Sequence, residues 1–570
     1  MEHDVINHTF CRKEFIVQRN SYDTILDRFY HWEEVTPNSV FLRQPTGSDW
    51  KEWTFDEAGG EIRKMAQYLK DQGLQKGDRV ALISKNCSYW IMADLAILMA
   101  GGVSVPLFPN QQAENISFCI DHCQAKIAFT GRIDDPAPLD EGIPAHVKTI
   151  GMEFPEGYTD TYKAQVSWQD AMKSSIPLAG KTQVDQDDMA SIIYTSGTTG
   201  RPKGVVHTYR GFGFAASTGS QYFNMTGDDR FISFLPLSHV AERVMVEYNS
   251  IYCGCSISFV QSLDTFAANV KAVAPTLFFA VPRIWKKFQL GILDKMPQQK
   301  LDRLLRVPLL SQLIKHKIRS GLGLHKARLI ISGAAPIAPS LIEWFDRLGV
   351  TIQEGYGQTE NIAYGTLNPK DDIEVGSVGK PMPSNQIKIG DDGEILIKND
   401  AVMTGYYLEP DKTAETMEDG YILTGDVGHL GPRGHLYITG RVKEIFKTDK
   451  GKYVAPAPIE SLISQNDAVE QICVMGTGMV QPVALVVLSE AARKRDRKDI
   501  SKEFSSMVQK VNQSLDHHEK IEKVLVCKEE WTVETGLMTP TLKVKRNQVE
   551  KKYRPMIDNP TVEDSVIFEN

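Results

Sequence analysis

One segment of the chain, residues 194–204, has a composition suited to binding a chain of phosphate groups. It combines four Ser and Thr hydroxyls, three glycines and one lysine in the order Tyr194-Thr195-Ser196-Gly197-Thr198-Thr199-Gly200-Arg201-Pro202-Lys203-Gly204. Glycine lets the backbone approach a ligand closely, successive N–H groups form an anion-binding hollow, and hydroxyls and lysine donate further hydrogen bonds. A flexible linker is the alternative, but linkers rarely place Pro-Lys-Gly and a strand-like Val205-Val206 directly afterwards. The segment therefore predicts a polyphosphate-binding loop after an apolar strand.

This loop differs from that of the common nucleoside triphosphatases. Their pattern requires a glycine, four residues and then Gly-Lys-Ser/Thr, and no such triplet follows Gly197 or Gly200. Residues 211–216 do fit the loose G-x-G-x-x-A form of a dinucleotide fingerprint. They come after the phosphate loop, however, instead of opening a first strand–helix–strand unit. We interpret these glycines as sites of close helix packing.

Four further segments carry side chains suited to a nucleotide. Residues 332–336 end a predicted strand and open a helix, the place where open α/β sheets bind ligands, and their small side chains leave room for a flat ring. At a second strand end, Tyr356 is suited to stacking on a base and Glu360 to holding Mg²⁺ between phosphate oxygens. Asp426 is suited to accepting both hydroxyls of a ribose, and Arg441 to reaching the same nucleotide. Singly, each also has an ordinary structural explanation, such as core packing or turn formation.

The elements that must position these side chains change in character along the chain. From about residue 54 to 360, continuous apolar runs alternate with helical patterns, which predicts strand–helix–strand layers. The runs are residues 80–84, 126–130, 231–235, 277–281 and 329–332. Residues 386–440 instead show hairpin patterns around the turn Asp391-Asp392-Gly393, which predicts a small β-rich subdomain. After residue 441 we expect strands at 469–475, 483–488 and 524–526 and a helix near 502–515.

The predicted fold class is therefore α/β, with a large N-terminal domain over residues 1–441 and a small α+β domain over 442–570. A chain of 570 residues is too long for one core. Its 42% hydrophobic and 24% charged residues are typical of soluble globular proteins, and its net charge of −8 argues against nucleic acid as a partner. The N-terminus lacks a secretory pattern and no apolar run is long enough to span a membrane, which predicts a cytoplasmic protein. Its 8 cysteines lack zinc-site spacing and are expected to be buried thiols.

Residues 300–328 form an unusually basic and amphipathic stretch. The only acidic residue is Asp302, against Lys300, Arg303, Arg306, Lys315, Lys317, Arg319, Lys326 and Arg328, and leucine and isoleucine residues are interleaved. Pro308 predicts two short helices instead of one. Such a stretch is suited to peripheral contact with an anionic membrane, here the inner face, and an ordinary surface helix is an equal alternative. The sequence does not predict the oligomeric state.

Together and in this order, these segments resemble the adenylate-forming superfamily of acyl-CoA synthetases, luciferases and peptide-synthetase adenylation domains. The resemblance runs from Trp53-Thr54-Phe55 to a C-terminal lysine motif at residues 538–546. Within that superfamily, residues 234–243, 275–285 and 447–456 resemble the long-chain fatty acyl-CoA synthetases. The resemblance implies an enzyme that uses ATP and Mg²⁺ to join a fatty acid to AMP, releasing pyrophosphate, and then transfers the acyl group to CoA. An acyl-AMP ligase that passes the acyl group to a carrier protein is the alternative, and a non-catalytic nucleotide- or membrane-binding module is a third.

The resemblance also implies roles for individual residues. Thr195 and Glu360 would hold Mg²⁺, residues 196–203 the triphosphate, Tyr356 and the backbone of 333–335 adenine, and Asp426 and Arg441 the ribose. The full nucleotide-binding set comprises Thr195, Ser196, Gly197, Thr198, Thr199, Gly200, Lys203, Gly333, Ala334, Ala335, Gly355, Tyr356, Gly357, Thr359, Asp426, Arg441 and Lys443.

The implied catalytic residues are Thr195, Glu360, His239 and Lys543. His239 would border the acyl pocket, and Lys543 would bridge carboxylate and phosphate. Many family members have glycine before that lysine, whereas this chain has Leu542. Spacing from Thr539 selects Lys543, with Lys545 as a competitor. Lys443 matches the family's hinge, about which the C-terminal domain would rotate between the two half-reactions.

Overall fold

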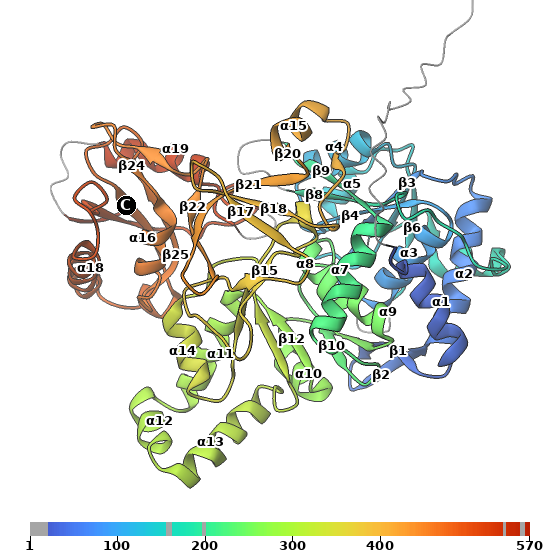
Figure 1. The fold of residues 1–570 in the computed structure, drawn as a ribbon, viewed down its shortest axis with the longest axis horizontal. Helices are drawn as coiled ribbons and strands as arrows, with labels where there is room; N and C mark the ends of the chain where they lie inside the picture. Colours follow the sequence, from blue (N-terminus) through green and yellow to red (C-terminus); the bar gives the residue numbers. More distant parts are fainter. Residues whose placement is uncertain (1–20, 155–161, 196–200, 540–542, 559–564, 570) are drawn as a thin grey trace, which may run out of the picture.

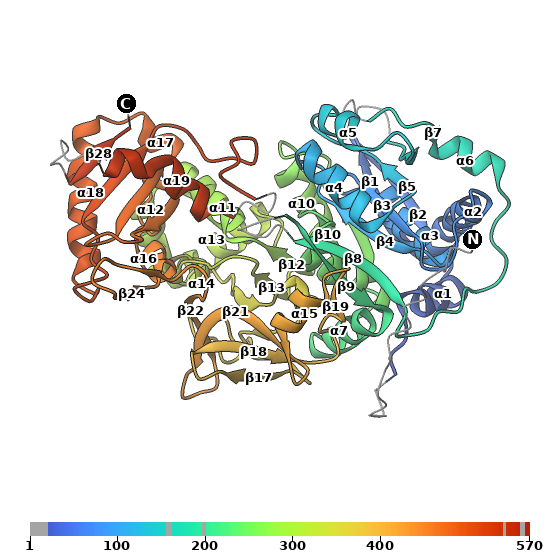
Figure 2. The same cartoon turned by 90° about the horizontal axis from the view of Figure 1, so that it is seen from above.

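The computed structural model of the chain describes residues 21–154, 162–195, 201–539, 543–558 and 565–569. These residues form an α/β protein in which a large N-terminal part and a smaller C-terminal part lie at opposite ends (Figure 1). The β-rich strands β17 (Gln386–Ile389), β18 (Glu394–Lys398) and β21 (Tyr421–Leu430) lie between them (Figures 1 and 2). The predicted fold class is confirmed, while the boundary at residue 441 stays a prediction.

The largest sheet has eight strands in the order β19-β9-β8-β4-β3-β5-β6-β7. The parallel strands from β8 to β7 are covered by helices, and α3 is buried along its whole length because its sequence is almost entirely apolar. β8 and β9 are antiparallel, so the predicted phosphate loop connects a hairpin. The strands are β3 (Arg79–Ile83), β4 (Val103–Leu107), β5 (Ile127–Thr130), β6 (Lys148–Gly151), β7 (Val166–Ser167), β8 (Met189–Thr195), β9 (Lys203–Thr208) and β19 (Gly405–Tyr406), and the helices are α2 (Phe55–Asp71), α3 (Ser88–Met99), α4 (Ala113–Cys123), α5 (Ala137–Gly142) and α6 (Trp168–Ser174).

The remaining strands of the N-terminal part form two further sheets. One has the order β10-β11-β1-β2, and the other β12-β13-β14-β15-β16. The strands are β1 (Val40–Thr46), β2 (Asp49–Thr54), β10 (Arg230–Ser233), β11 (Ser256–Phe259), β12 (Leu277–Ala280), β13 (Leu329–Ser332), β14 (Gln353–Tyr356), β15 (Thr366–Leu367) and β16 (Lys380–Pro381). The helices are α1 (Ile25–Val35), α7 (Tyr209–Tyr222), α8 (Val240–Glu242), the π-helical η1 (Arg243–Tyr248), α9 (Asn249–Cys253), α10 (Phe266–Val273), α11 (Pro282–Lys295), α12 (Gln298–Leu305), α13 (Pro308–Gly321), α14 (Pro339–Asp346) and the 3₁₀ turn η2 (Thr359–Asn361). The predicted break before Pro308 is confirmed.

Two helix predictions need correction. After β13 the next helix begins at Pro339 and not directly after Pro336, because Ala334 has a left-handed φ of 64° and proline is favoured at the first helical position. The helix expected near 502–515 is α18 (Arg497–Asn512), which begins earlier because the Asp496 carboxylate caps it. The glycines of α7 do serve close packing, since a Cβ on Gly213 would lie 2.8 Å from the carbonyl oxygen of Asp23.

The C-terminal part is built on one four-stranded sheet, β25-β26-β27-β28. Its elements are β23 (Phe446–Lys447), β24 (Tyr453–Val454), α16 (Pro456–Ile463), β25 (Val469–Met475), β26 (Val483–Leu488), α17 (Glu490–Arg493), α18, β27 (Lys523–Cys527), α19 (Arg546–Ile557) and β28 (Val566–Phe568). The β-rich subdomain adds α15 (Pro410–Thr416), β20 (Met417–Glu418) and β22 (Leu436–Arg441). All cysteines among the described residues are buried and free, as predicted. In the described part of the chain, no helix combines the length and the apolar composition needed to cross a bilayer.

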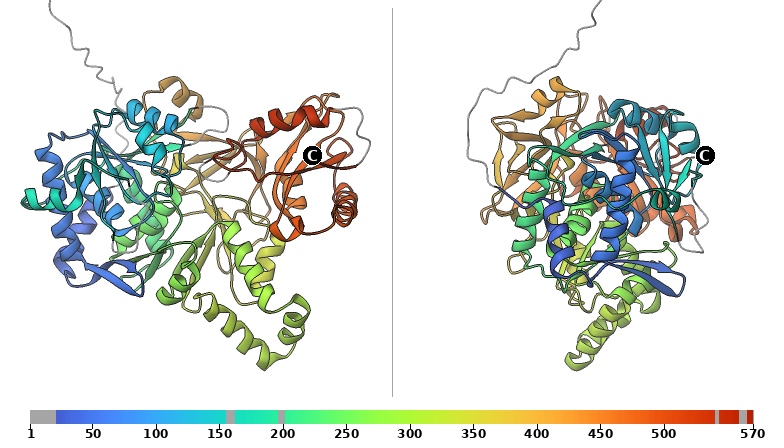
Figure 3. Two further views of the ribbon diagram at one scale, coloured as in Figure 1. Left: turned by 180° about the vertical axis from the view of Figure 1, so that it is seen from behind. Right: turned by 90° about the vertical axis from the view of Figure 1, so that its right-hand side faces the viewer.

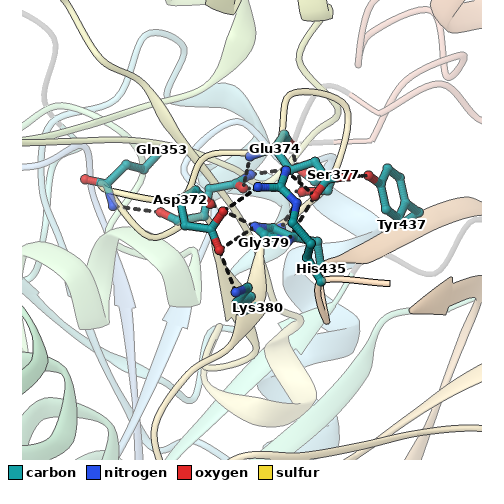
Figure 4. A network of polar contacts seen from close by, with 10 residues as sticks. Gln353, Asp372, Glu374, Ser377, Gly379, Lys380, His435 and Tyr437 are labelled. Atoms are coloured by element: carbon teal, nitrogen blue, oxygen red, sulfur yellow. Dashed lines mark hydrogen bonds and ion pairs between the residues drawn. The ribbon is translucent and has the colours of Figure 1, made fainter. Parts of the chain in front are cut away.

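A polar network ties β22 to the loop between β15 and β16 (Figure 4). Asp372 pairs with Lys380 at 2.5 Å and with Arg433 at 2.7 Å, and Arg433 also reaches Glu374 at 2.6 Å. The buried ring of His435 bonds the carbonyl oxygen of Asp372 at 2.8 Å through Nε2. Because Arg433 and His435 directly precede β22, the network fixes the start of the strand that ends at Arg441.

Candidate active site

A chain of contacts joins the end of β8 to Glu360. Thr195, the last residue of β8, is paired with Lys203, the first residue of β9. The Lys203 ammonium lies 4.7 Å from the ring centroid of Tyr406, whose hydroxyl donates to Glu360 Oε1 at 2.8 Å. The structure thus brings together Thr195, Lys203 and Glu360, whose roles at a nucleotide stay a prediction. Ser196, Gly197, Thr198, Thr199 and Gly200 lie outside the described residues.

Glu360 and Thr195 provide the oxygen ligands that Mg²⁺ prefers. Tyr406 occupies only Oε1 of Glu360, and no described side chain donates to Oε2. Magnesium commonly binds through one or two carboxylates together with substrate phosphates and water. The arrangement therefore fits an ion that arrives with a triphosphate.

Asp426 lies at the centre of a second cluster. The carboxylate is buried and accepts hydrogen bonds from the Tyr356 hydroxyl at 2.6 Å, from Gln358 Nε2 at 2.7 Å and from Arg441 Nε at 2.6 Å. Burial, and then the nearby Asp426, raise the pKa of Tyr356 well above its usual value, so its hydroxyl stays a donor. The pairing of β21 with β22 sets Asp426 opposite Arg441. A ribose would therefore have to exchange with one of these donors or share the carboxylate with them.

The small residues after β13 and within 355–359 allow chain segments to pack closely. A Cβ on Gly333 would lie 3.1 Å from the carbonyl oxygen of Gly355, and one on Gly357 would lie 2.4 Å from the carbonyl carbon of Ala363. Ala334 and Ala335 follow in the bend, and Thr359 opens η2. The close approach of two backbone segments thus favours glycine at these positions. The sequence analysis suggested a second role, which is to leave room for a flat ring.

Lys543 belongs to the C-terminal part, and its charge interacts with that of the Asp426 cluster. Two hydrogen bonds tie its backbone to Thr539, because the Thr539 N–H donates to the Lys543 carbonyl oxygen at 2.8 Å and the Lys543 N–H donates to Thr539 Oγ1 at 3.1 Å. The Lys543 side chain keeps contact with solvent, yet its pKa is lowered, first by surrounding protein and then by the charge of Arg441. Asp426 and Glu360 act on it in the opposite direction. Lys545 instead stands directly before α19, where its N–H donates to the Leu537 carbonyl oxygen at 2.8 Å.

The charge of Lys543 also acts on the pKa of His239. Its Nδ1 accepts the Ala241 N–H at 3.1 Å, which caps α8 and assigns the ring proton to Nε2. Burial, and then Lys543, lower the pKa of His239 to about 4, so the ring is neutral at pH 7. His239 can therefore donate one hydrogen bond from Nε2 without adding a positive charge.

A buried ion cluster holds the segment that follows His239. Arg243, on η1, donates to Asp94 Oδ1 at 2.5 Å and to Ser191 Oγ at 2.6 Å, and Glu247 lies 3.5 Å away. The side chains of Arg243, Asp94 and Glu247 have 0% exposure. Because Ser191 belongs to β8, this cluster links the strand that ends at Thr195 to the His239 segment.

Several positive charges converge on one region. The pKa of Lys203 is lowered, first by partial removal from water and second by the nearby Lys443. The pKa of Lys543 is depressed in part by Arg441. Like charges held this close destabilise one another until an anion binds between them. These lowered pKa values favour a highly charged anionic ligand, such as a triphosphate.

Two site residues were missed by the sequence analysis. Gln358 donates to Asp426 and to the Thr424 carbonyl oxygen at 2.8 Å, and it lies within a motif that had already been singled out. Tyr406, which contacts both Glu360 and Lys203, is far from the other motifs in sequence and enters the site because β19 pairs with β9. Only the tertiary structure shows the role of Tyr406.

Ion pairs link α11 to the C-terminal part, which carries Lys543. Arg283 Nη2 lies 3.3 Å from Glu470 Oε1 and 3.6 Å from Glu530 Oε1, and Lys286 pairs with Asp467. These side chains are partly exposed, so each pair contributes on the order of 0.2–1 kcal/mol. Together they favour the present orientation of the C-terminal part relative to α11.

We expect the double variant Arg283→Glu, Lys286→Glu to slow acyl-AMP formation by roughly threefold to tenfold, since the favourable pairs become repulsive. Pyrophosphate release in a single turnover is the measurement. Lys287→Glu is the matched control, because Lys287 is exposed on the same helix and, among the described residues, makes no ion pair. Adding Glu470→Arg should restore part of the rate. An unchanged rate in the double variant would show that these pairs do not set the domain orientation.

Comparisons with known proteins identify the family of the chain. Residues 29–407 match the AMP-binding enzyme family and residues 444–561 the AMP-binding enzyme C-terminal domain. The long-chain-fatty-acid–CoA ligase FadD15 of Mycobacterium bovis is 29% identical, covering 94% of this chain and 97% of that protein. Long-chain-fatty-acid–CoA ligase 5 of Mus musculus is 30% identical, covering 87% and 83%.

A solved structure shares the fold. The o-succinylbenzoate CoA synthetase MenE from Bacillus subtilis, in complex with its acyl-adenylate intermediate OSB-AMP, has a TM-score of 0.73 at 21% identity, covering 93% of this chain and 99% of that one. At this identity the likeness concerns the fold alone. From its match to the family model over residues 29–407, together with the C-terminal domain match, the chain belongs to the AMP-binding enzyme family.

Proposed function

We propose that the protein is a long-chain fatty acid–CoA ligase that works through an acyl-AMP intermediate. The observation that carries this proposal is the pair of contacts that place cations beside carboxylates: Arg441 Nε donates to Asp426, and Lys203 lies over the ring of Tyr406, whose hydroxyl donates to Glu360. Such an arrangement suits a nucleoside triphosphate at the ends of β8 and β14. The long-chain substrate is supported by the names of the relatives found in Mycobacterium bovis and Mus musculus.

In the first half-reaction, a carboxylate oxygen of the fatty acid attacks the α-phosphorus of ATP. The bond from that phosphorus to the bridging oxygen breaks, and pyrophosphate leaves. Negative charge grows on the phosphate oxygens, and fixed positive groups stabilise it without forming bonds. Lys203 and residues 196–200 would hold the leaving phosphates, and Lys543 the reacting carboxylate and α-phosphate. Mg²⁺ held by Thr195 and Glu360 would supply additional positive charge.

In the second half-reaction, the sulfur of the CoA thiolate attacks the acyl carbonyl and AMP leaves. The neutral ring of His239 would border the acyl group, where a hydrogen-bond donor without a charge suits a carbonyl oxygen. Asp426 and Arg441 would keep AMP in place through both steps. We further propose that residues 1–441 and 442–570 act as separate domains, with the boundary at the segment that carries Lys443.

The function is tested by measuring AMP and CoA thioester with free carboxylic acids of graded chain length, ATP and Mg²⁺. We expect acyl-CoA formation that rises toward long chains. The reason for the chain-length trend is the gain of about 0.8 kcal/mol per buried methylene. Acyl-AMP without any thioester would point to a carrier-protein acceptor, and no pyrophosphate with any acid would refute the adenylating activity itself.

A further inference from the structure

The hairpin formed by α12 and α13 projects from the N-terminal part (Figures 1 and 3). Its inner face is anchored, since Leu301 is buried and Leu305, Ile314 and Ile318 pack against the core beside β12 and β13. The hairpin is therefore a fixed feature of the fold, with one face turned away from the protein.

The outer face carries large apolar side chains at the turn of the hairpin. Leu309 is 84% exposed, Leu313 is 68% exposed and Val307 is 50% exposed. Leu309 and Leu313 are four residues apart on α13 and so share one face of the helix. Single exposed leucines are ordinary, but three such side chains at one projecting turn mark an interaction site.

Unpaired positive charges surround these apolar side chains. Lys300, Arg303, Arg306 and Lys317 are all exposed, and among the described residues no carboxylate forms an ion pair with any of them. Asp302, the only acidic residue of this stretch, is paired with Arg347. The chain as a whole carries a net charge of −8, so the hairpin is a local basic surface on an acidic protein.

We propose that the α12–α13 hairpin docks on an anionic lipid bilayer. Leu309 and Leu313 would enter the acyl-chain boundary, and Arg303, Arg306 and Lys317 would lie at the headgroups. Apolar side chains ringed by Lys and Arg match a surface that is apolar inside and anionic outside, as a bilayer is. Such docking would place the protein at the bilayer, into which long-chain fatty acids partition.

The test is cosedimentation of the full chain with vesicles of phosphatidylcholine containing phosphatidylglycerol, without ATP, CoA or fatty acid. Binding is thus measured independently of the proposed ligase activity. We expect at least tenfold weaker binding to pure phosphatidylcholine, and strong weakening in 0.5 M NaCl, because each cation near an anionic surface contributes roughly fivefold.

Two variants separate the apolar and the electrostatic contributions. Leu309→Ser, Leu313→Ser should lower the partition coefficient at least tenfold, whereas Leu263→Ser should not, although Leu263 is also 84% exposed. Arg303→Gln, Arg306→Gln, Lys317→Gln should remove most of the preference for phosphatidylglycerol. The control Lys70→Gln, Lys271→Gln, Lys551→Gln removes the same charge from exposed sites elsewhere.

Unchanged thermal unfolding temperatures would show that all variants fold. Equal binding by hairpin variants and controls overturns the proposal, as does equal binding to neutral and anionic vesicles. A further outcome is that the protein does not bind vesicles but forms dimers, and that the Leu309→Ser, Leu313→Ser variant is monomeric. That result would assign the surface to a second copy of the chain and would also overturn the proposal.

Discussion

Replacing Lys543 by alanine should slow acyl-AMP formation about a hundredfold or more. Lys543 comes from the C-terminal part, its charge lowers the pKa of His239, and Arg441, Asp426 and Glu360 act on its own pKa. Removal of one fixed donor from a site of developing negative charge commonly costs a factor of 10² to 10³ in rate. Binding of ATP should be affected less, because residues around Lys203 and Asp426 remain.

Single-turnover release of pyrophosphate measures this step directly. Lys545→Ala is the matched control, since Lys545 is two residues away and its N–H contact with Leu537 does not depend on the side chain. The control should keep most of the rate. The reverse result, a slow Lys545→Ala and a nearly normal Lys543→Ala, would assign the catalytic role to Lys545.

Lys543 should also make adenylation sensitive to alkaline pH. In the free protein its pKa lies below the usual lysine value, because surrounding protein and Arg441 disfavour the charged form. Only the ammonium can stabilise the phosphate oxygens, so the rate of adenylation should fall as pH rises through this pKa. Bound phosphates would raise the pKa again, and saturating ATP should shift the alkaline limb of the profile to higher pH.

The sequence could predict those parts of the site that lie at the ends of strands. Thr195 ends β8, because an apolar run stops where hydroxyl residues and glycine begin, and Tyr356 ends β14, where the sequence analysis placed a second strand end. Asp426 and Arg441 lie on neighbouring strands of a predicted hairpin region, and pairing brings them together. In each case a local pattern carries the information.

Other features depend on contacts that no local pattern specifies. Continuous apolar runs predict buried strands, but they do not predict which strands are neighbours. For example, β3, β10 and β13 have similar apolar runs and belong to three separate sheets. Tyr406 reaches Glu360 through the pairing of β19 with β9. Arg283 and Lys286 face the C-terminal part through side chains on an otherwise ordinary surface helix. These contacts are set by how the elements pack, and the spacing of residues does not encode them.

Lys443→Pro should impair thioester formation far more than adenylation. In the proposed mechanism Lys543 bridges the carboxylate and the α-phosphate, so CoA would reach the acyl carbonyl only if the C-terminal part moved. The segment after β22 is the natural pivot: Glu444 and Ile445 donate their N–H groups to the Arg441 carbonyl oxygen at 3.0 and 3.1 Å, and no described backbone bond uses the Lys443 N–H. Proline at 443 therefore removes no backbone hydrogen bond seen here, yet it fixes φ near −65° and prevents the torsional change that rotation needs.

The two half-reactions can be measured separately, by pyrophosphate release and by CoA thioester formation from preformed acyl-AMP. We expect thioester formation to fall about a hundredfold, and adenylation to stay within roughly tenfold because proline also crowds the preceding Val442. Lys443→Ala, which removes the charge and leaves φ free, separates the backbone effect from the loss of a cation near Lys203. If Lys443→Pro slows both half-reactions equally, or if Lys443→Ala reproduces its effect, the pivot does not lie at Lys443 and the residue acts through its charge instead.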